Sequence, residues 1–186
     1  LSLPALSMIG PLLGDDSQAF HRLLHPTGEW AARFMIIGMM ASGLMLLFKG
    51  RQWPRWLVHH RRDIEVAAFV YAALHTIVYV IDRGTLDRII EALPHTDIWT
   101  GWLAMLIFVP LALTSNNAAQ RWLHTGWKTL HRSSYPAAVR VLIHGAALHN
   151  WGSWPPAAVH FGPLIGLWAY RLWYWYLRPR APFATA

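Results

Sequence analysis

The stretch HRSSYPAAVRVLIHGAALH, residues 131–149, decides the fold because it places ionisable side chains in an apolar run long enough to cross a bilayer. It carries three histidines and two arginines, of which Arg140 lies within the apolar run. An ionisable side chain at membrane depth is costly, so it indicates a function. The neutral imidazole of histidine also binds metals. A second apolar run, residues 64–81, holds His75, so the function depends on whether His75 faces a histidine of the first stretch.

The composition is that of an integral membrane protein. Of the 186 residues, 55% are hydrophobic and only 13% are charged, whereas about a quarter of a soluble domain is charged. The apolar blocks are about 18–20 residues long, which is enough to span the hydrocarbon of a bilayer. The absence of cysteine excludes disulfides, thiolate metal sites and iron–sulfur ligation by the chain. The net charge of +7 is concentrated in particular loops, so the expected partner is the lipid bilayer and not nucleic acid.

We predict an all-α, polytopic transmembrane helical bundle with five full spans in a single domain, residues 1–186. The spans cover residues 30–48, 64–81, 98–114, 133–149 and 157–177. Residues 1–14 are the tail of a truncated first helix, a signal-peptide remnant or an interfacial segment. Pro26, in the polar stretch 17–27, suits a helix start, and LDRIIEAL favours a short surface helix. No internal repeat is evident.

The basic residues alternate between the loops. Five Lys and Arg residues lie in 49–63, three in 115–132 and two in the C-terminal tail, whereas the intervening loops hold two, with excess acid, and none. The positive-inside rule therefore places 49–63, 115–132 and the C-terminus in the cytoplasm. Most tryptophans fall near the ends of the predicted spans, as aromatic belts do.

Depth links His75 to His144. Each lies eleven residues after the cytoplasmic start of its span, so both are about 16 Å above the inner edge of the membrane. Two imidazoles at one depth, on helices running in the same direction, could bind a haem iron from both sides. Such an iron keeps no open position for a substrate and serves electron transfer. Alternatively, each histidine makes a hydrogen bond between helices.

His131 could bind a second haem, because it lies about 20 Å below His144 along a continuous helix. Its partner would be needed near Arg61, where the chain has no histidine, and His59 and His60 fall in the basic loop. Otherwise His131 faces lipid phosphate at the membrane rim. Near the outer edge, His149 and His160 could replace His144, bind an outer cofactor or face water. We favour the last of these, that they face water. The remaining histidines are expected in loops: His21, His25, His95 and His124.

Two arginines need partners. Arg33 follows Glu29 by one helical turn near the outer edge, so it could pair with Glu29 or reach a haem propionate. Arg140 precedes His144 by one turn near mid-bilayer, where a bare charge is costly. Its partner would be a propionate or an acidic residue of another subunit. Snorkelling to lipid phosphate is the alternative for both, and it is weak for Arg140.

No sequence motif supplies other chemistry. The chain has no Gly-rich nucleotide loop, no HExxH and no nucleophile elbow, so no catalytic residue is assigned. Flavin and pyridine nucleotide would be handled by another protein.

Several segments resemble a known family. RRDIEVAAFVYAALHTIVYV resembles the third helix of ferric-reductase-like transmembrane proteins. TSNNAAQRWLHTGWKTLHRSSY and HPTGEWAARF resemble segments of the MsrQ (YedZ) branch of that family. The resemblance implies a six-helix haem b protein of the bacterial inner membrane whose haem histidines match His75, His131 and His144. It also implies electron transfer to a periplasmic molybdenum-dependent methionine sulfoxide reductase.

We therefore predict an electron-transfer subunit, a membrane cytochrome b with one haem b or two. Its electrons would come from a cytoplasmic flavin reductase containing FMN or from quinol, and would pass to a periplasmic redox protein. Two other functions remain open. One is an accessory subunit, with or without haem, packed against a larger membrane complex. The other is a membrane protein without haem whose histidines bind metal or relay protons.

Overall fold

The computed structural model describes residues 1–8, 18–148 and 152–178, and the described residues are helical, without any strand. The elements are, in chain order, α1 (Leu3–Ser7), α2 (Ala19–Leu47), α3 (Gln52–His59), α4 (Arg61–Arg83), α5 (Leu86–Ala92), α6 (Thr96–Leu113), α7 (Asn117–Leu123), α8 (Thr125–His131), α9 (Ser134–Ala147), α10 (Trp154–Leu172) and the π-helical turn η2 (Trp173–Leu177). The predicted all-α class is confirmed.

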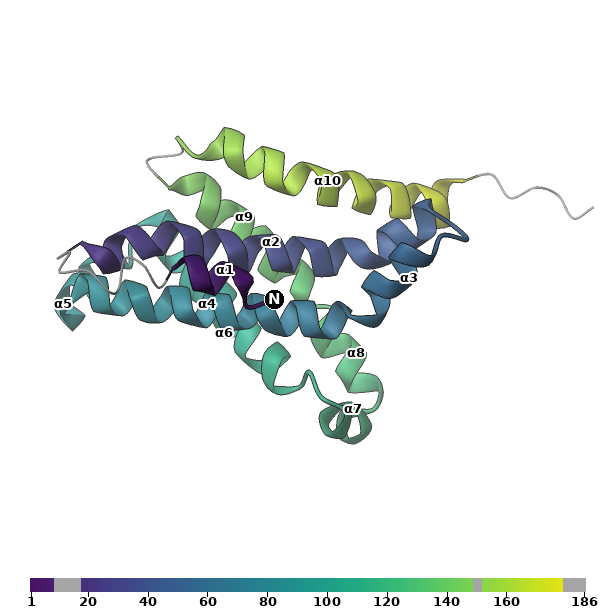
Figure 1. Cartoon of the computed structure of the whole chain (residues 1–186), viewed down its shortest axis with the longest axis horizontal. Helices are drawn as coiled ribbons and strands as arrows, with labels where there is room; N and C mark the ends of the chain where they lie inside the picture. Colours follow the sequence, from purple (N-terminus) through teal and green to yellow (C-terminus); the bar gives the residue numbers. More distant parts are fainter. Residues whose placement is uncertain (9–17, 149–151, 179–186) are drawn as a thin grey trace, which may run out of the picture.

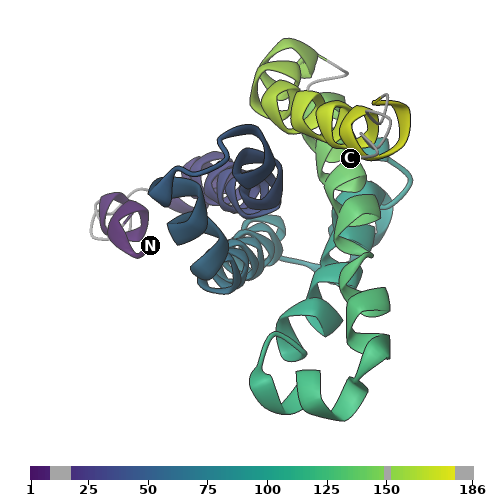
Figure 2. The ribbon, with the colours of Figure 1, turned by 90° about the vertical axis from the view of Figure 1, so that its right-hand side faces the viewer.

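Two helix pairs form the bundle. Helix α2 packs along α4 in the most extensive contact between elements, and α6 packs on α9 in the next most extensive. Helix α10 lies across both pairs, against α2 and α9 (Figures 1 and 2). The short helices α7 and α8 project from one side of the bundle in both views. His75, on α4, and His144, on α9, therefore belong to different helix pairs.

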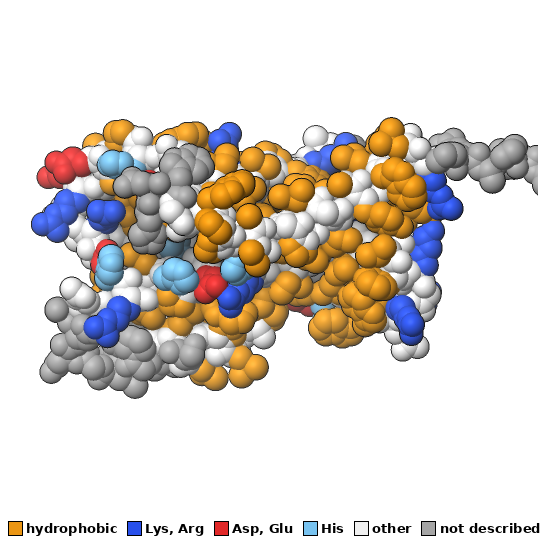
Figure 3. Space-filling view, turned by 90° about the horizontal axis from the view of Figure 1, so that it is seen from above, with side chains coloured by type: hydrophobic (Ala, Val, Ile, Leu, Met, Phe, Trp, Pro, Cys, Tyr) orange, Lys and Arg blue, Asp and Glu red, His pale blue; other side chains and the backbone are white. Residues whose placement is uncertain are grey.

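The core lies mainly between α2 and α4, and the outer faces are apolar. Phe34, Met35 and Met39 of α2 are buried in the same cluster as Ile64 and Tyr71 of α4. Large apolar side chains are nevertheless exposed on several helices, including Val70 and Ile77 on α4, Leu106 on α6 and Val159 on α10. Figure 3 shows such side chains along the length of one face. Apolar surface of this extent indicates contact with lipid.

Three of the five predicted spans are long and apolar enough to cross a membrane: α2, α4 and α6. Helix α9 has 14 residues, about 21 Å of helix, which is shorter than the hydrocarbon thickness. Helix α10 has 19 residues but does not meet the same hydropathy criterion. The multi-pass helical membrane bundle is thus confirmed, and the number of five full spans stays a prediction.

The start of α2 corrects one expectation. The helix begins at Ala19, so Pro26 lies inside it and does not begin it. Proline removes one backbone hydrogen bond, but packing of α2 along α4 continues on both sides of it. His21 and His25 are consequently on a helix and not in a loop, and His21 Nδ1 lies 3.3 Å from an Asp82 carboxylate oxygen of α4.

The polar segments also form helices. The basic segment 49–63, expected as a loop, contains α3 and the start of α4, whereas the predicted surface helix LDRIIEAL is confirmed as α5. In Figure 3 the charges at the end near α3 and η2 are Lys and Arg, whereas the opposite end mixes Lys, Arg, acidic and His side chains. Within residues 1–8 the chain forms α1, and the Tyr71 hydroxyl donates to the Leu1 carbonyl at 3.2 Å.

Candidate functional site

His75 and His144 come together where the two helix pairs meet. His75 lies on α4 and His144 on α9, and their ring centroids are 6.1 Å apart with the ring planes at 75°. The two histidines selected by depth therefore do face each other. Their role as iron ligands remains a prediction.

Helix α2 holds the His75 ring through one face, which we call the His75 seat: Leu24, Thr27 and Gly28. The Nδ1–H of His75 donates to the Leu24 carbonyl at 3.0 Å and lies 3.2 Å from the Thr27 hydroxyl oxygen. A Cβ atom at Gly28 would be only 3.1 Å from Nδ1 and Cε1 of the ring. The three residues share a helix face because they are spaced i, i+3 and i+4.

Helix α6 holds the His144 ring in the same way, through the His144 seat: Asp97, Thr100 and Gly101. His144 Nδ1–H donates to the Asp97 carbonyl. A Cβ atom at Gly101 would approach Nδ1 to 2.9 Å, closer than real Cβ contacts. The two seats thus share a spacing, a carbonyl acceptor followed three and four residues later by threonine and glycine.

The hydrogen bonds determine the form of both imidazoles. A carbonyl oxygen can only accept, so Nδ1 carries the proton in each ring and the lone pair is on Nε2. Metal-binding histidines characteristically donate their other N–H to a carbonyl or carboxylate, which fixes the tautomer and the ring orientation. Both His75 and His144 donate Nδ1–H to a carbonyl in this way.

The donor set suits haem better than a bare metal ion. Two imidazoles each at about 2 Å from one metal would have ring centroids about 6 Å apart, close to the observed separation. Among the described residues no group of three or more histidine, aspartate or glutamate side chains could hold a metal ion. A structural zinc takes four protein ligands, whereas a haem brings its own equatorial nitrogens and needs only axial ones. The residues present therefore fit haem.

His131 has a different environment. Its ring stacks on Trp127 with centroids 4.0 Å apart, and its Nε2 lies 3.0 Å from the Thr114 hydroxyl. Since that hydroxyl also donates to the Pro110 carbonyl, Nε2–H of His131 is the donor in this contact. Partial burial, and then the charges of Arg61 and Arg62, hold the pKa of His131 below its usual range.

No histidine within the described part of the chain stacks on or bonds to His131. The narrow cavity beside it, between α2, α4 and α6, is lined by Arg61 and Glu65, which form an ion pair at 2.7 Å. The continuous helix from His131 to His144 is interrupted, because α8 ends at His131 and α9 begins at Ser134. A lower haem ligated by His131 stays a prediction.

The two arginines differ in their partners. Arg33 pairs with Glu29 at 2.5 Å, as expected, and its guanidinium lies over the Trp30 ring. Arg140 is expected to pair with a haem propionate or with an acidic residue of another subunit, and no ion pair joins it to a carboxylate of the described residues. Its guanidinium instead lies 5.8 Å from the centre of the Trp99 ring. Propionate binding by Arg33 or Arg140 remains a prediction.

Two further histidines, His149 and His160, were predicted near the outer edge of the membrane. His149 lies outside the described residues, so its predicted alternatives are not tested. His160 on α10 contacts Glu29 of α2 through Nε2 at 3.5 Å. Its Nδ1 is bonded to the Pro156 carbonyl of its own helix at 2.8 Å.

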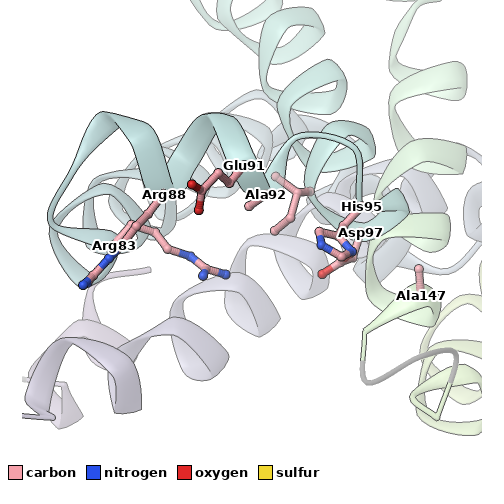
Figure 4. A pocket seen from close by; sticks show the side chains of 8 residues that line it. Arg83, Arg88, Glu91, Ala92, His95, Asp97 and Ala147 are labelled. Atoms are coloured by element: carbon pink, nitrogen blue, oxygen red, sulfur yellow. The ribbon is translucent and has the colours of Figure 1, made fainter.

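A polar pocket adjoins the His144 seat. Its volume is about 440 Å³, and its lining includes Arg83, Arg88, Glu91, His95 and Asp97. Figure 4 shows Arg83, Arg88 and Glu91 toward one side and His95 and Asp97 toward the other. Asp97 lines this pocket and its backbone carbonyl accepts from His144, so the pocket lies beside the His144 seat.

Sequence reasoning missed the residues that position the rings: Leu24, Thr27, Gly28, Asp97, Thr100 and Gly101. The available signal was a threonine three residues after the residue whose carbonyl accepts, followed by a glycine, in LHPTG and in DIWTG. Each dipeptide lies near the start of an apolar helix. The dipeptide is too common to be recognised without the tertiary contacts.

The comparisons with known proteins agree with this arrangement. Residues 27–142 match the family described as ferric reductase like transmembrane component. Relatives from Brucella ovis, Brucella canis and Brucella suis are each 34% identical over 184 residues, 95% of this chain and 78% of each relative. Each is named protein-methionine-sulfoxide reductase heme-binding subunit MsrQ. No solved structure matches the chain. The chain therefore belongs to the ferric-reductase-like transmembrane family, in its MsrQ branch.

Proposed function

We propose that the chain is the haem b subunit of a membrane electron-transfer system, with His75 and His144 as the axial ligands. The observation that carries this proposal is the pair of imidazoles, 6.1 Å apart, each with Nδ1 bonded to a backbone carbonyl. The relatives' printed name, which describes a heme-binding subunit, supports it.

In this proposal the protein supplies position and environment. The iron of a haem with two histidine ligands exchanges one electron and binds no substrate. His75 and His144 would hold the iron from two helices, while the carbonyls of Leu24 and Asp97 keep both Nδ1 protons in place. Both rings are half-buried where the two helix pairs meet.

The direction of transfer follows from the charges. With the basic end of the bundle in the cytoplasm of a bacterial inner membrane, the donor would be a flavin reductase with an acidic surface, or quinol. The acceptor would be a periplasmic redox protein. The relatives' name supports a methionine sulfoxide reductase in that role. That this reductase depends on molybdenum is an expectation from the family resemblance alone. The polar pocket beside Asp97 supports an approach to the His144 side.

The test of haem binding is a dithionite-reduced minus oxidised spectrum of the detergent-purified protein, with pyridine haemochrome quantitation. A sharp b-type α-band with one or two haems per chain is expected. A colourless protein that does not take up added haem would contradict the proposal and favour a structural subunit of a larger complex.

The acceptor is tested separately. The reduced protein is mixed with a periplasmic molybdenum-dependent methionine sulfoxide reductase and methionine sulfoxide, and the α-band is followed. Reoxidation that requires both additions is expected. If the haem stays reduced with both present, that acceptor is wrong, while haem binding itself is unaffected.

A further inference from the structure

The two seats repeat one arrangement around two different histidines. In each, a backbone carbonyl of the facing helix accepts from Nδ1, and a glycine four residues later gives the ring space. In each, the threonine in between bonds the same carbonyl as the histidine, Thr27 that of Leu24 at 3.0 Å and Thr100 that of Asp97 at 3.3 Å. The backbone of α2 and α6 is thereby shaped to receive a ring.

Burial sets these threonines apart. Thr27 is 1% exposed and Thr100 is fully buried, and they are the two buried polar residues in the part of the chain that the structure describes. A buried hydroxyl must be hydrogen-bonded, and each threonine achieves this by donating to the carbonyls three and four residues before it. In a purely structural role an apolar residue of the same shape would serve as well.

We propose that Thr27-Gly28 and Thr100-Gly101 are paired positioning elements for the two axial histidines and that they tune the haem through Nδ1. This inference rests on the proposed haem function. The glycines set how closely each ring approaches its carbonyl. Each threonine hydroxyl bonds the carbonyl that also accepts from Nδ1–H, and so it changes how strongly that carbonyl accepts from the ring. A stronger acceptor makes the imidazole a more basic ligand.

The two seats are not equivalent. The Thr27 oxygen is also within 3.2 Å of Nδ1 of His75, so it is a second acceptor for that proton. Thr100 makes no hydrogen bond to His144; its hydroxyl bonds the carbonyls of Thr96 and Asp97. His75 is therefore the ligand whose basicity depends more directly on a side chain.

The glycines are tested with Gly28→Ala and Gly101→Ala, with Gly145→Ala as the matched control. Gly145 lies next to His144 on α9, but a Cβ there would meet nothing within 4 Å. Haem per chain is expected to fall severalfold for both test variants, more for Gly101→Ala, and to stay unchanged for the control. The thermal melt of the haem-free protein is measured in parallel, because alanine favours a helix over glycine.

The threonines are tested with Thr27→Val, which keeps the shape and removes the hydroxyl, and Thr27→Ser, which keeps the hydroxyl. The readout is the haem midpoint potential from a redox titration. Thr27→Val is expected to raise the potential, because the ring loses an acceptor and becomes a less basic ligand. Thr27→Ser, which keeps the hydroxyl, is expected to keep the potential of the unaltered protein. Thr100→Val is expected to give a smaller shift, toward a lower potential, because Thr100 only shares the Asp97 carbonyl with His144 Nδ1–H and its loss makes that carbonyl a stronger acceptor.

The outcomes separate this inference from the haem proposal. If the unaltered protein binds no haem, both are overturned. If it binds haem but the glycine variants keep full haem content, or Thr27→Val leaves the potential unchanged or lower, only the positioning role is overturned. If Thr27→Val does not fold, Thr27→Ala replaces it. The inference then requires that Thr27→Ala raise the potential and that Thr27→Ser keep the potential of the unaltered protein.

Discussion

His75 and His144, here called the outer pair, and His131, here called the inner histidine, show two uses of one residue type. His75 and His144 each donate Nδ1–H to a carbonyl, which leaves the lone pair of Nε2 for a metal. His131 instead uses Nε2 in a hydrogen bond to Thr114 and stacks on Trp127. The difference teaches which nitrogen keeps a lone pair: Nε2 in His75 and His144, and Nδ1 in His131. The groups bonded to the other nitrogen of each ring decide which nitrogen is available.

The largest expected effect breaks the outer pair. His75→Ala and His144→Ala should each abolish the low-spin haem spectrum, because removal of either imidazole leaves the iron with one axial ligand. The measurement is the reduced α-band together with haem per chain. His149→Ala is the control and should leave the spectrum nearly intact. If His149→Ala bleaches the protein while His144→Ala does not, the ligand assignment on α9 is wrong.

A smaller effect is expected from the inner histidine. His131→Ala should leave the α-band of the outer pair in place, and haem per chain should fall by about half at most, the loss of one haem of two. Trp127→Leu removes the stacked ring and serves as the comparison variant. Complete loss of haem in His131→Ala would show that the contrast between the two regions does not hold.

The ion pair near the outer pair should affect stability more than haem. Glu29→Gln removes the carboxylate that contacts Arg33 and His160. Because these side chains are partly exposed, the free energy of unfolding should fall by about 1 kcal/mol or less. Thermal melts of the haem-loaded protein measure this. A large loss of haem would instead mean that Arg33 needs Glu29 in order to position a propionate.

The smallest effect concerns Arg140. Trp99→Leu removes the ring below its guanidinium and should cost about 0.5–1 kcal/mol, the usual strength of a cation–π contact. Haem content should not change, since the hydrogen bonds that hold the two histidine rings go to the Leu24 and Asp97 carbonyls and not to Trp99 or Arg140. Trp122→Leu, at a strongly exposed tryptophan of α7, is the control. Equal melting temperatures for Trp99→Leu and the unaltered protein would show that Arg140 finds its partner elsewhere.

Parts of the fold followed from local pattern. The spans around His75 and Trp99 were predicted to within a few residues, because a long apolar run in lipid can satisfy its backbone groups only as a helix. The start of α2 was missed, since packing along α4 carries the helix through Pro26 into a polar stretch. The start of α9 at Ser134 agrees to within one residue with the predicted start of the fourth span at residue 133.

The sequence by itself determined the helical membrane class, the family resemblance and the choice of His75 and His144, because hydrophobicity and depth along a helix are properties of single segments. Only the tertiary structure showed that the two rings meet, which nitrogen each one leaves for a metal, and that Thr27-Gly28 and Thr100-Gly101 face them. These contacts join residues more than forty positions apart. Their physical cause is the rotation and approach of packed helices, which a local pattern does not specify.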